Sequence, residues 1–286
     1  MIESRGQGKV TKTRTTYVNM ALSVLLFYLL FVCFLFLNQR DFIYHPQNAK
    51  PDLAASGLEN VEIIAVQPID MKESIEGWYI PPLGTRPVIL YFHGNGLNID
   101  TRVPRIVPWI EAGYGVLLAE YRGYGQNPGN PTEIGFRADA TAYMEWLTQR
   151  ENIPARRIVV YGESIGSGTA VWLASQTADV AALILEAPFT SLTDIARKRF
   201  FFAPVDLLLK DRFDNKSKIR NVAAPLLVMH GARDSVVPPK YGKMLFEAAN
   251  QPKELKLFPE AGHNDLHQYG AGQAVLEFLN KLEEGK

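Results

Sequence analysis

Val159-Val160-Tyr161-Gly162-Glu163-Ser164-Ile165-Gly166-Ser167-Gly168 is the stretch that decides the fold of this 286-residue chain. A β-branched run leads into a Gly-x-Ser-x-Gly turn, and small residues that can open a helix follow. The pattern predicts a strand, a sharp turn and a helix, with the Ser164 hydroxyl held at the apex between glycines. Because so short a pattern also arises by chance, the rest of the chain has to supply its structural context.

Strand and helix patterns alternate on both sides of this turn. The predicted strands are 61–69 and 75–80, expected as antiparallel edge strands, and then 87–92, 115–120, 158–161, 182–186, 225–230 and 255–258. The predicted helices are 132–149, 165–176, 239–249 and 266–282. Nearly continuous apolar strands that alternate with helices predict an α/β fold, in which a mostly parallel sheet is covered by helices on both faces.

Residues 189–224 interrupt the alternation. Basic residues at 197–199 are followed by three phenylalanines at 200–202 and by an apolar run at 205–209. This composition indicates a small helical cap over a site, which could meet an acyl chain. The alternative is that the aromatic side chains pack down onto the sheet.

An apolar run of 21 residues, 17–37, is long enough to cross a bilayer as one helix. Basic residues dominate positions 1–16, where a single acid, Glu3, is outnumbered by Arg5, Lys9, Lys12 and Arg14, whereas 38–41 carries no net charge. This bias predicts a cytoplasmic N-terminus and a catalytic domain on the extracytoplasmic side. A cleaved signal peptide is the alternative, but the run is longer than a usual signal core and no small-x-small site follows it. We therefore expect an uncleaved signal-anchor.

The expected organisation is a basic cytoplasmic N-terminus (1–16), a transmembrane helix (17–37), a linker (38–60) and one α/β domain (61–286). Thirty basic and thirty acidic residues give no net charge, which argues against nucleic acid as a partner. The single cysteine, Cys33, lies in the apolar run, so the domain has no thiol nucleophile or cysteine metal site. No cofactor motif is found, and the lack of a cysteine cluster argues against a metal site.

A serine hydroxyl needs a base to take its proton and a third group to orient that base. Asp234 and His263 each follow a predicted strand, as Ser164 does. Because the carboxyl ends of parallel strands meet at one edge of a sheet, we expect the three side chains to converge there. Their chain order, Ser-Asp-His, is the order expected for α/β-hydrolases.

From about residue 61 onward the chain resembles the α/β-hydrolase superfamily. Four motifs carry the resemblance: Tyr91-Phe92-His93-Gly94-Asn95-Gly96, Glu120-Tyr121-Arg122-Gly123-Tyr124-Gly125, the turn at Ser164, and Gly262-His263-Asn264-Asp265. They are similar to membrane-anchored α/β-hydrolase domain-containing proteins and to bacterial serine-aminopeptidase-like relatives, although relatives often have aspartate at Glu120. The resemblance implies an oxyanion hole formed by the backbone N–H groups of Asn95 and Ile165.

Other residues compete for the same roles. His93 precedes Gly-Asn at a strand end, so we expect it to hold the oxyanion loop rather than to act as the base. Asp265, Asp206 and Asp194 are rivals of Asp234, which is favoured by its place directly after a strand.

The expected activity is hydrolysis of carboxylic ester or thioester bonds, in an acyl lipid, an acylated protein or another small molecule, through an acyl-enzyme. A serine peptidase is the first alternative, since some relatives bear that label. A non-catalytic binding protein that kept the fold is the alternative of another class.

Overall fold

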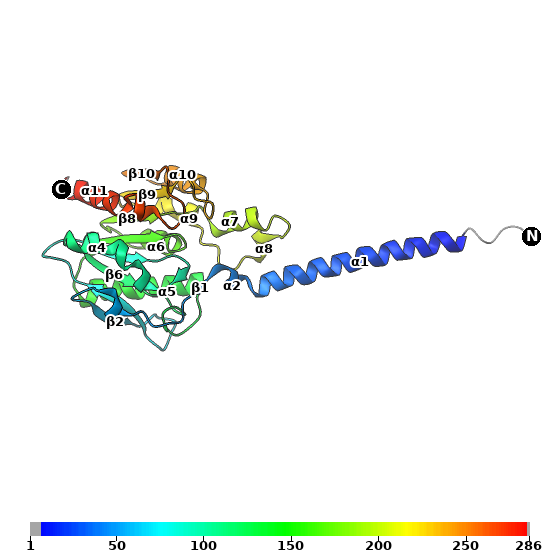
Figure 1. Cartoon of the computed structure of the whole chain (residues 1–286), viewed down its shortest axis with the longest axis horizontal. Helices are drawn as coiled ribbons and strands as arrows, with labels where there is room; N and C mark the ends of the chain where they lie inside the picture. The colour runs from blue at the N-terminus through cyan, green and yellow to red at the C-terminus, as the bar shows by residue number, and fades with distance from the viewer. Residues whose placement is uncertain (1–6, 285–286) are drawn as a thin grey trace, which may run out of the picture.

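The computed structural model describes residues 7–284, with side chains from residue 14. Arg5 and the rest of 1–6 lie outside the described residues, as do the side chains of Lys9 and Lys12. A long helix, α1 (Gln7–Leu37), extends away from a body that contains all the remaining elements (Figure 1). Its part from Arg14 to Leu37 is long and apolar enough to cross a membrane, and none of it is buried in the protein.

An eight-stranded sheet forms the centre of the body, in the order β10-β9-β8-β7-β4-β6-β3-β2. Its strands are β2 (Glu62–Val66), β3 (Ile75–Ile80), β4 (Val88–Phe92), β6 (Gly115–Ala119), β7 (Ile158–Glu163), β8 (Ala182–Glu186), β9 (Leu226–Gly231) and β10 (Lys253–Phe258). β3 is antiparallel to both of its neighbours, and every other pairing is parallel. The predicted mostly parallel sheet with antiparallel edge strands is therefore confirmed.

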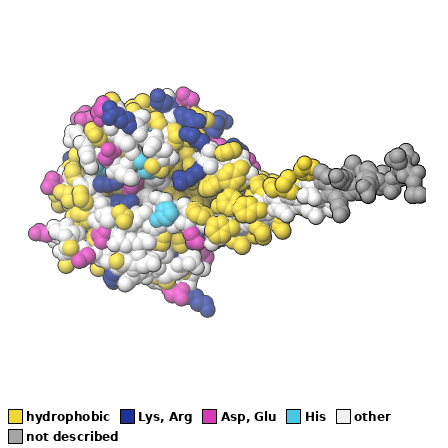
Figure 2. Space-filling view, turned by 45° about the vertical axis from the view of Figure 1, so that its right-hand side comes forward, with side chains coloured by type: hydrophobic (Ala, Val, Ile, Leu, Met, Phe, Trp, Pro, Cys, Tyr) yellow, Lys and Arg dark blue, Asp and Glu magenta, His cyan; other side chains and the backbone are white. Residues whose placement is uncertain are grey.

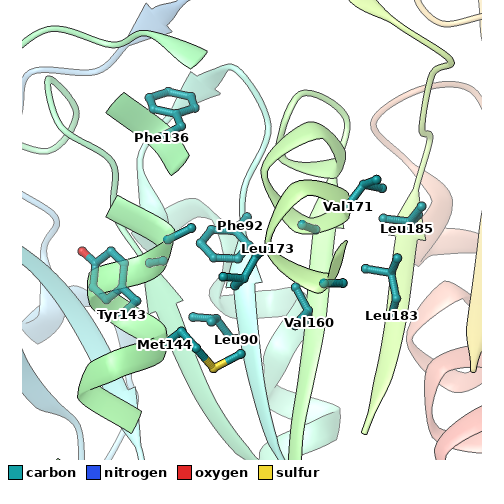
Figure 3. Packing of buried hydrophobic residues seen from close by; sticks show 14 of the residues in the cluster. Leu90, Phe92, Phe136, Tyr143, Met144, Val160, Val171, Leu173, Leu183 and Leu185 are labelled. Carbon is teal, nitrogen blue, oxygen red and sulfur yellow. The ribbon is translucent and has the colours of Figure 1, made fainter. Parts of the chain in front are cut away.

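Helices cover both faces of this sheet. On one face lie α5 (Glu133–Glu145), which ends in a π-helical turn (Trp146–Arg150), α6 (Gly166–Gln176) and α10 (Pro239–Ala248); on the other lie α4 (Val103–Glu111) and α11 (Ala271–Glu284). Successive residues of β4 alternate between the two cores, with Leu90 and Phe92 in the first and Tyr91 in the second. Figure 3 shows Leu90 and Phe92 packed against the side chains of α5 and α6. Burial of the strands on both faces explains their continuous apolar sequence.

One predicted helix is divided in the structure, and one further helix was not predicted. The closing helix, expected over 266–282, is divided into a 3-10 turn (Leu266–Tyr269) and α11. The break is at Gly270, whose φ of +95° is a conformation that glycine adopts readily and other residues avoid. Helix α4 was not expected at all, because Pro104 and Pro108 interrupt its sequence.

Residues 38–60 and 189–224 contain short elements. The first segment holds α2 (Gln39–Ile43), β1 (His45–Pro46) and α3 (Leu53–Ser56), and β1 pairs with β5 (Gly96–Leu97). The second holds α7 (Leu192–Arg199), α8 (Val205–Leu208), α9 (Asn215–Lys218) and a 3-10 turn (Ile219–Asn221). In Figure 1, α7 and α8 lie next to the end of α1 that joins the body.

Candidate active site

Ser164 follows β7 in a strained turn. Its φ of +51° is a left-handed conformation that is uncommon outside glycine, and its N–H donates to the carbonyl of Glu186 at 2.8 Å. A Cβ at Gly166 would lie 2.2 Å from the carbonyl oxygen of Phe92, so only glycine fits there. The turn therefore brings α6 against the end of β4 and leaves the Ser164 hydroxyl partly exposed.

His263 lies within hydrogen-bonding distance of Ser164. It follows β10 in a loop, and its Nε2 is 3.0 Å from the Ser164 Oγ. Its Nδ1 is 2.7 Å from Oδ2 of Asp234, in the loop after β9. Ser164, His263 and Asp234 thus form one hydrogen-bonded chain at the carboxyl edge of the sheet.

The Asp234 carboxylate is held by four groups. Oδ1 accepts hydrogen bonds from the N–H groups of Val236 at 2.9 Å and Val237 at 2.8 Å. Oδ2 contacts His263 and also Nε2 of His230, at 3.3 Å. Burial alone would raise the pKa of Asp234, but the hydrogen bonds from His230 and His263 outweigh burial and hold this pKa well below its usual range. Asp234 is therefore ionised at neutral pH.

His230 is a neighbour of the site that sequence reasoning passed over. Its Nε2 lies 2.8 Å from the carbonyl oxygen of Val237, which can only accept, so Nε2 carries the proton. That proton is shared with Asp234, while the buried Nδ1 has no partner among the described residues. The position of His230 near the end of a buried strand was the sequence signal for this role, because buried ring nitrogens need hydrogen-bond partners.

The loop after β4 brings Asn95 beside the Ser164 turn. The carbonyls of Phe92 and His93 pack on Gly166, and Gly94 packs on Glu163. The N–H groups of Asn95 and Ile165 donate no hydrogen bond within the described part of the chain. Two free amides thus lie in the loops that flank the hydroxyl.

The N-terminal segment and His93 hold this loop in place. The Asn95 side chain donates to the carbonyl of Ile43 at 2.9 Å, and the Asn95 carbonyl accepts from the N–H of His45 at 2.9 Å. His93 is buried, and its Nε2 is 2.8 Å from the carboxylate of Glu120. His93 thus lies under the loop, and its Nε2 contacts Glu120 instead of the Ser164 hydroxyl. Glu120 provides a carboxylate at the position where relatives often have aspartate.

A buried charge network lies directly beneath the Ser164 turn. Glu163 and Glu186 are paired in register on β7 and β8, and Arg105 Nη1 lies 3.2 Å from the first and 3.3 Å from the second. Arg102 Nε adds an ion pair to Glu163 at 3.1 Å. Arg105 also donates to the carbonyl of Asn264, next to His263, at 3.4 Å. Carboxylates at the ends of buried strands were the signal for this network, since they need cationic partners.

The rival aspartates are engaged elsewhere. Asp265 Oδ1 accepts from the N–H of Gly262 at 2.7 Å, Asp194 accepts from Thr190, and Asp206 is exposed and paired with Arg197. In the described range 7–284, no three His, Cys, Asp or Glu side chains are grouped as metal ligands would be. The geometry thus brings Ser164, His263 and Asp234 together and leaves the rival aspartates bonded to other groups.

Comparisons with known proteins point to one family for this chain. Residues 87–216 match the model of the alpha/beta hydrolase fold. An uncharacterized Mycobacterium tuberculosis protein is 37% identical over 253 residues, covering 88% of this chain and 89% of the relative. Protein bem46 of Schizosaccharomyces pombe is 33% identical over 203 residues, 68% of each chain. Lysophosphatidylserine lipase ABHD12 of Danio rerio is 32% identical over 198 residues, 62% of this chain and 51% of the relative. The Pyrococcus furiosus esterase Pf2001 has the same fold, with a TM-score of 0.68 at 19% identity over 84% of this chain and 98% of the esterase.

Proposed function

Because this chain belongs to the alpha/beta hydrolase family, we propose that it is a membrane-anchored serine hydrolase that cleaves carboxylic ester or thioester bonds. The observation that carries the proposal is the hydrogen-bonded chain from Ser164 through His263 to Asp234. A hydroxyl on a strained turn, next to a base whose far nitrogen faces a carboxylate, is the arrangement that nucleophilic acyl transfer requires.

The proton positions support this mechanism. Ionised Asp234 can only accept, so Nδ1 of neutral His263 carries the proton and donates it at 2.7 Å. Nε2 then has a free lone pair 3.0 Å from the Ser164 Oγ. His263 takes the hydroxyl proton as Oγ attacks the acyl carbonyl, and Asp234 stabilises the resulting imidazolium.

The remaining steps use the two free backbone amides. The N–H groups of Asn95 and Ile165 receive the negative charge on the carbonyl oxygen as the tetrahedral intermediate forms. His263 returns the proton to the departing alcohol or thiol, which leaves the acyl group on Ser164. Water, deprotonated by the same imidazole, then attacks the acyl-enzyme and restores the free hydroxyl.

An acyl lipid or an acylated protein is the proposed substrate class. The apolar helix α1 would hold the domain at a bilayer, where such substrates are concentrated. The name of the Danio rerio relative, a lysophosphatidylserine lipase, favours a lipid ester. We place the N-terminus in the cytoplasm and the domain on the other side, because basic residues precede α1 in the sequence.

A fluorophosphonate probe tests the mechanism. The wild-type chain should be labelled, whereas Ser164→Ala should not be labelled and should lose about 10⁴-fold or more in kcat. Ser167→Ala is the matched control, since Ser167 lies one helical turn further on and contacts Asn215 instead of His263. Equal labelling of wild type and Ser164→Ala would remove Ser164 from the mechanism.

A substrate series tests the bond type. Ester, thioester and amide substrates that share one acyl group should show esters and thioesters cleaved faster than amides. Preference for the amide would support the peptidase alternative, and loss of all turnover with an intact fold would support a binding protein.

A further inference from the structure

The segment made of the loop after α7 and of helix α8 carries exposed apolar side chains. In this cap tip, defined as residues 200–209, Phe201 is 85% exposed and Leu207 is 81% exposed. Figure 2 shows hydrophobic side chains continuing from α1 onto the adjoining side of the body, with Lys and Arg side chains gathered beside them. A contiguous exposed apolar surface of this kind marks an interaction site.

The cap tip contacts α1 directly. The Tyr28 hydroxyl donates to the carbonyl of Phe202 at 2.9 Å, and the rings of Phe31 and Phe202 are stacked with centroids 5.8 Å apart. Towards the end of α1, the Lys210 ammonium lies 4.4 Å from the ring centroid of Phe36. The surface therefore runs along the apolar helix and is not isolated from it.

These contacts define a depth along α1. Tyr28 precedes Leu37, the last residue of α1, by about 14 Å along the helix axis at about 1.5 Å per residue. Half of a bilayer's hydrocarbon core is about 15 Å. A bilayer that surrounds the apolar part of α1 therefore also surrounds the cap tip.

The backbone of the cap tip suits an apolar environment. The Phe200 carbonyl accepts from the N–H of Ala203 at 2.9 Å, and the Val205 carbonyl accepts from the N–H of Leu209 at 2.9 Å. The Phe202 carbonyl, at the turn itself, is satisfied by the Tyr28 hydroxyl. Backbone groups in lipid must be bonded within the protein, and a tyrosine hydroxyl within a membrane helix needs the same.

We propose that the cap tip inserts into the bilayer that α1 crosses, in the leaflet next to the domain, as a second lipid contact of the enzyme. Exposed basic side chains lie on both sides of the cap tip, with Lys198 and Arg199 before it and Lys210 and Arg212 after it. Long basic side chains at such positions reach lipid phosphates while their stems remain in apolar surroundings. The partner is therefore a bilayer that contains anionic lipid.

Insertion has a consequence for the active site. The same segment continues to Phe213, which packs on Gly168, and to Asn215, whose side chain contacts the Ser167 hydroxyl at 3.4 Å. Gly168 and Ser167 both lie in the first turn of α6, which follows Ser164 closely in the chain. The lipid-inserted segment is thus connected to the site through one run of the chain, which would present lipid-held acyl groups to Ser164.

Spin labelling of the full-length chain tests the insertion, which rests on the proposed anchoring by α1. Phe201→Cys, Leu207→Cys and Leu83→Cys are built on Cys33→Ser, labelled with a nitroxide and placed in phosphatidylcholine–phosphatidylglycerol vesicles. Labels at 201 and 207 should collide with oxygen more than with a water-soluble nickel chelate. The label at 83, which is 71% exposed in the turn before β4 at the opposite edge of the sheet, should show the reverse.

A label on the native Cys33 distinguishes failure of the cap-tip insertion from failure of the anchoring by α1. Lipid-like accessibility at 33 with water-like accessibility at 201 and 207 would overturn the insertion and leave the anchoring intact. Water-like accessibility at 33 would overturn both, and neither result depends on whether Ser164 is catalytic.

Activity gives an independent measurement. Phe201→Asp combined with Leu207→Asp should lower hydrolysis of a long-chain ester held in vesicles by about 10-fold, because two apolar anchors are lost. Hydrolysis of a water-soluble short-chain ester should be unchanged, which shows that the variant is folded. Equal rates on both substrates in variant and wild type would overturn the role of insertion in substrate delivery.

Discussion

Nε2 of His230 lies 3.3 Å from Oδ2 of Asp234, the same oxygen that His263 contacts. The carboxylate therefore has a second, buried donor that takes no part in proton transfer. This donor contributes to the lowered pKa of Asp234 and so keeps the carboxylate ionised.

Replacement of His230 should weaken catalysis without abolishing it. His230→Phe keeps a ring but removes the N–H, and a lost hydrogen bond to a charged group corresponds to about a 10–100-fold fall in kcat. The pKa of Asp234 should rise toward its usual range, and the loss should appear in kcat while KM stays constant, because the contact acts on the Asp234–His263 pair and not on substrate binding. His230→Gln can still donate from its amide and should recover much of the activity. A wild-type kcat in His230→Phe would show that this contact does not act on the site.

The side chain of Asn95 should matter through its tether to Ile43. Asn95→Ala removes the 2.9 Å hydrogen bond but keeps the backbone N–H, so kcat should fall by about 10-fold, less than the 10²–10³-fold typical of a lost oxyanion donor. Asn98→Ala is the matched control, because Asn98 also donates its amide to the N-terminal segment, at the Ala49 carbonyl. Steady-state kinetics on a soluble ester should show the loss in Asn95→Ala alone. Similar kcat values in the two variants would contradict a specific role for the tether.

The sequence predicted the sheet well because buried parallel strands are apolar throughout. It also predicted that Ser164, Asp234 and His263 would share one edge, since each follows a strand, and the structure joins them by hydrogen bonds. Helix α4 was missed because Pro104 and Pro108 argue against a helix. In the structure Pro104 occupies the first turn, where proline is tolerated, and burial of Ile106 and Trp109 on one side of the helix offsets Pro108.

Contacts between distant segments could not be predicted from local pattern. Nothing in the sequence around Tyr28 indicates that its hydroxyl meets Phe202, 174 residues later. Likewise, the arginine partners of Glu163 come from α4 and its preceding turn, and they become apparent only once the helix is packed on the sheet. Tertiary packing decides such contacts, whereas strand patterns are decided locally.

Gly166 should tolerate no side chain. A Cβ there would lie 2.2 Å from the Phe92 carbonyl oxygen and 2.6 Å from that of His93, so backbone would have to move. Gly166→Ala should lower the free energy of unfolding by about 3 kcal/mol and abolish turnover. Gly272→Ala, in α11, is the control: its nearest neighbour is at 3.6 Å, and alanine should add up to about 1 kcal/mol. Urea unfolding in detergent micelles measures both, and comparable stability of the two variants would contradict the close packing at the turn.

Glu163 should make stability depend on pH in the acid range. Burial would raise the pKa of this carboxyl, but Arg102 and Arg105 outweigh burial and hold the pKa well below its ordinary value. A depressed pKa in the folded state contributes stability that is complete above the unfolded value of about 4.3 and is lost progressively as pH falls below it. Glu163→Gln leaves both guanidiniums without this partner, so at pH 7 it should lose about 3–5 kcal/mol of unfolding free energy.

The difference between wild type and Glu163→Gln should therefore be largest at pH 6–7 and shrink below about pH 4.3. Glu254→Gln serves as the comparison, because the ion pair of Glu254 with Lys281 is on the surface and should be worth at most about 1 kcal/mol at any pH. Urea unfolding from pH 3 to 7 gives both curves. A difference that stays constant over this range would mean that the pKa of Glu163 is the same in the folded and the unfolded protein. Arg102 and Arg105 would then not stabilise the Glu163 carboxylate, and the electrostatic account of the turn would fail.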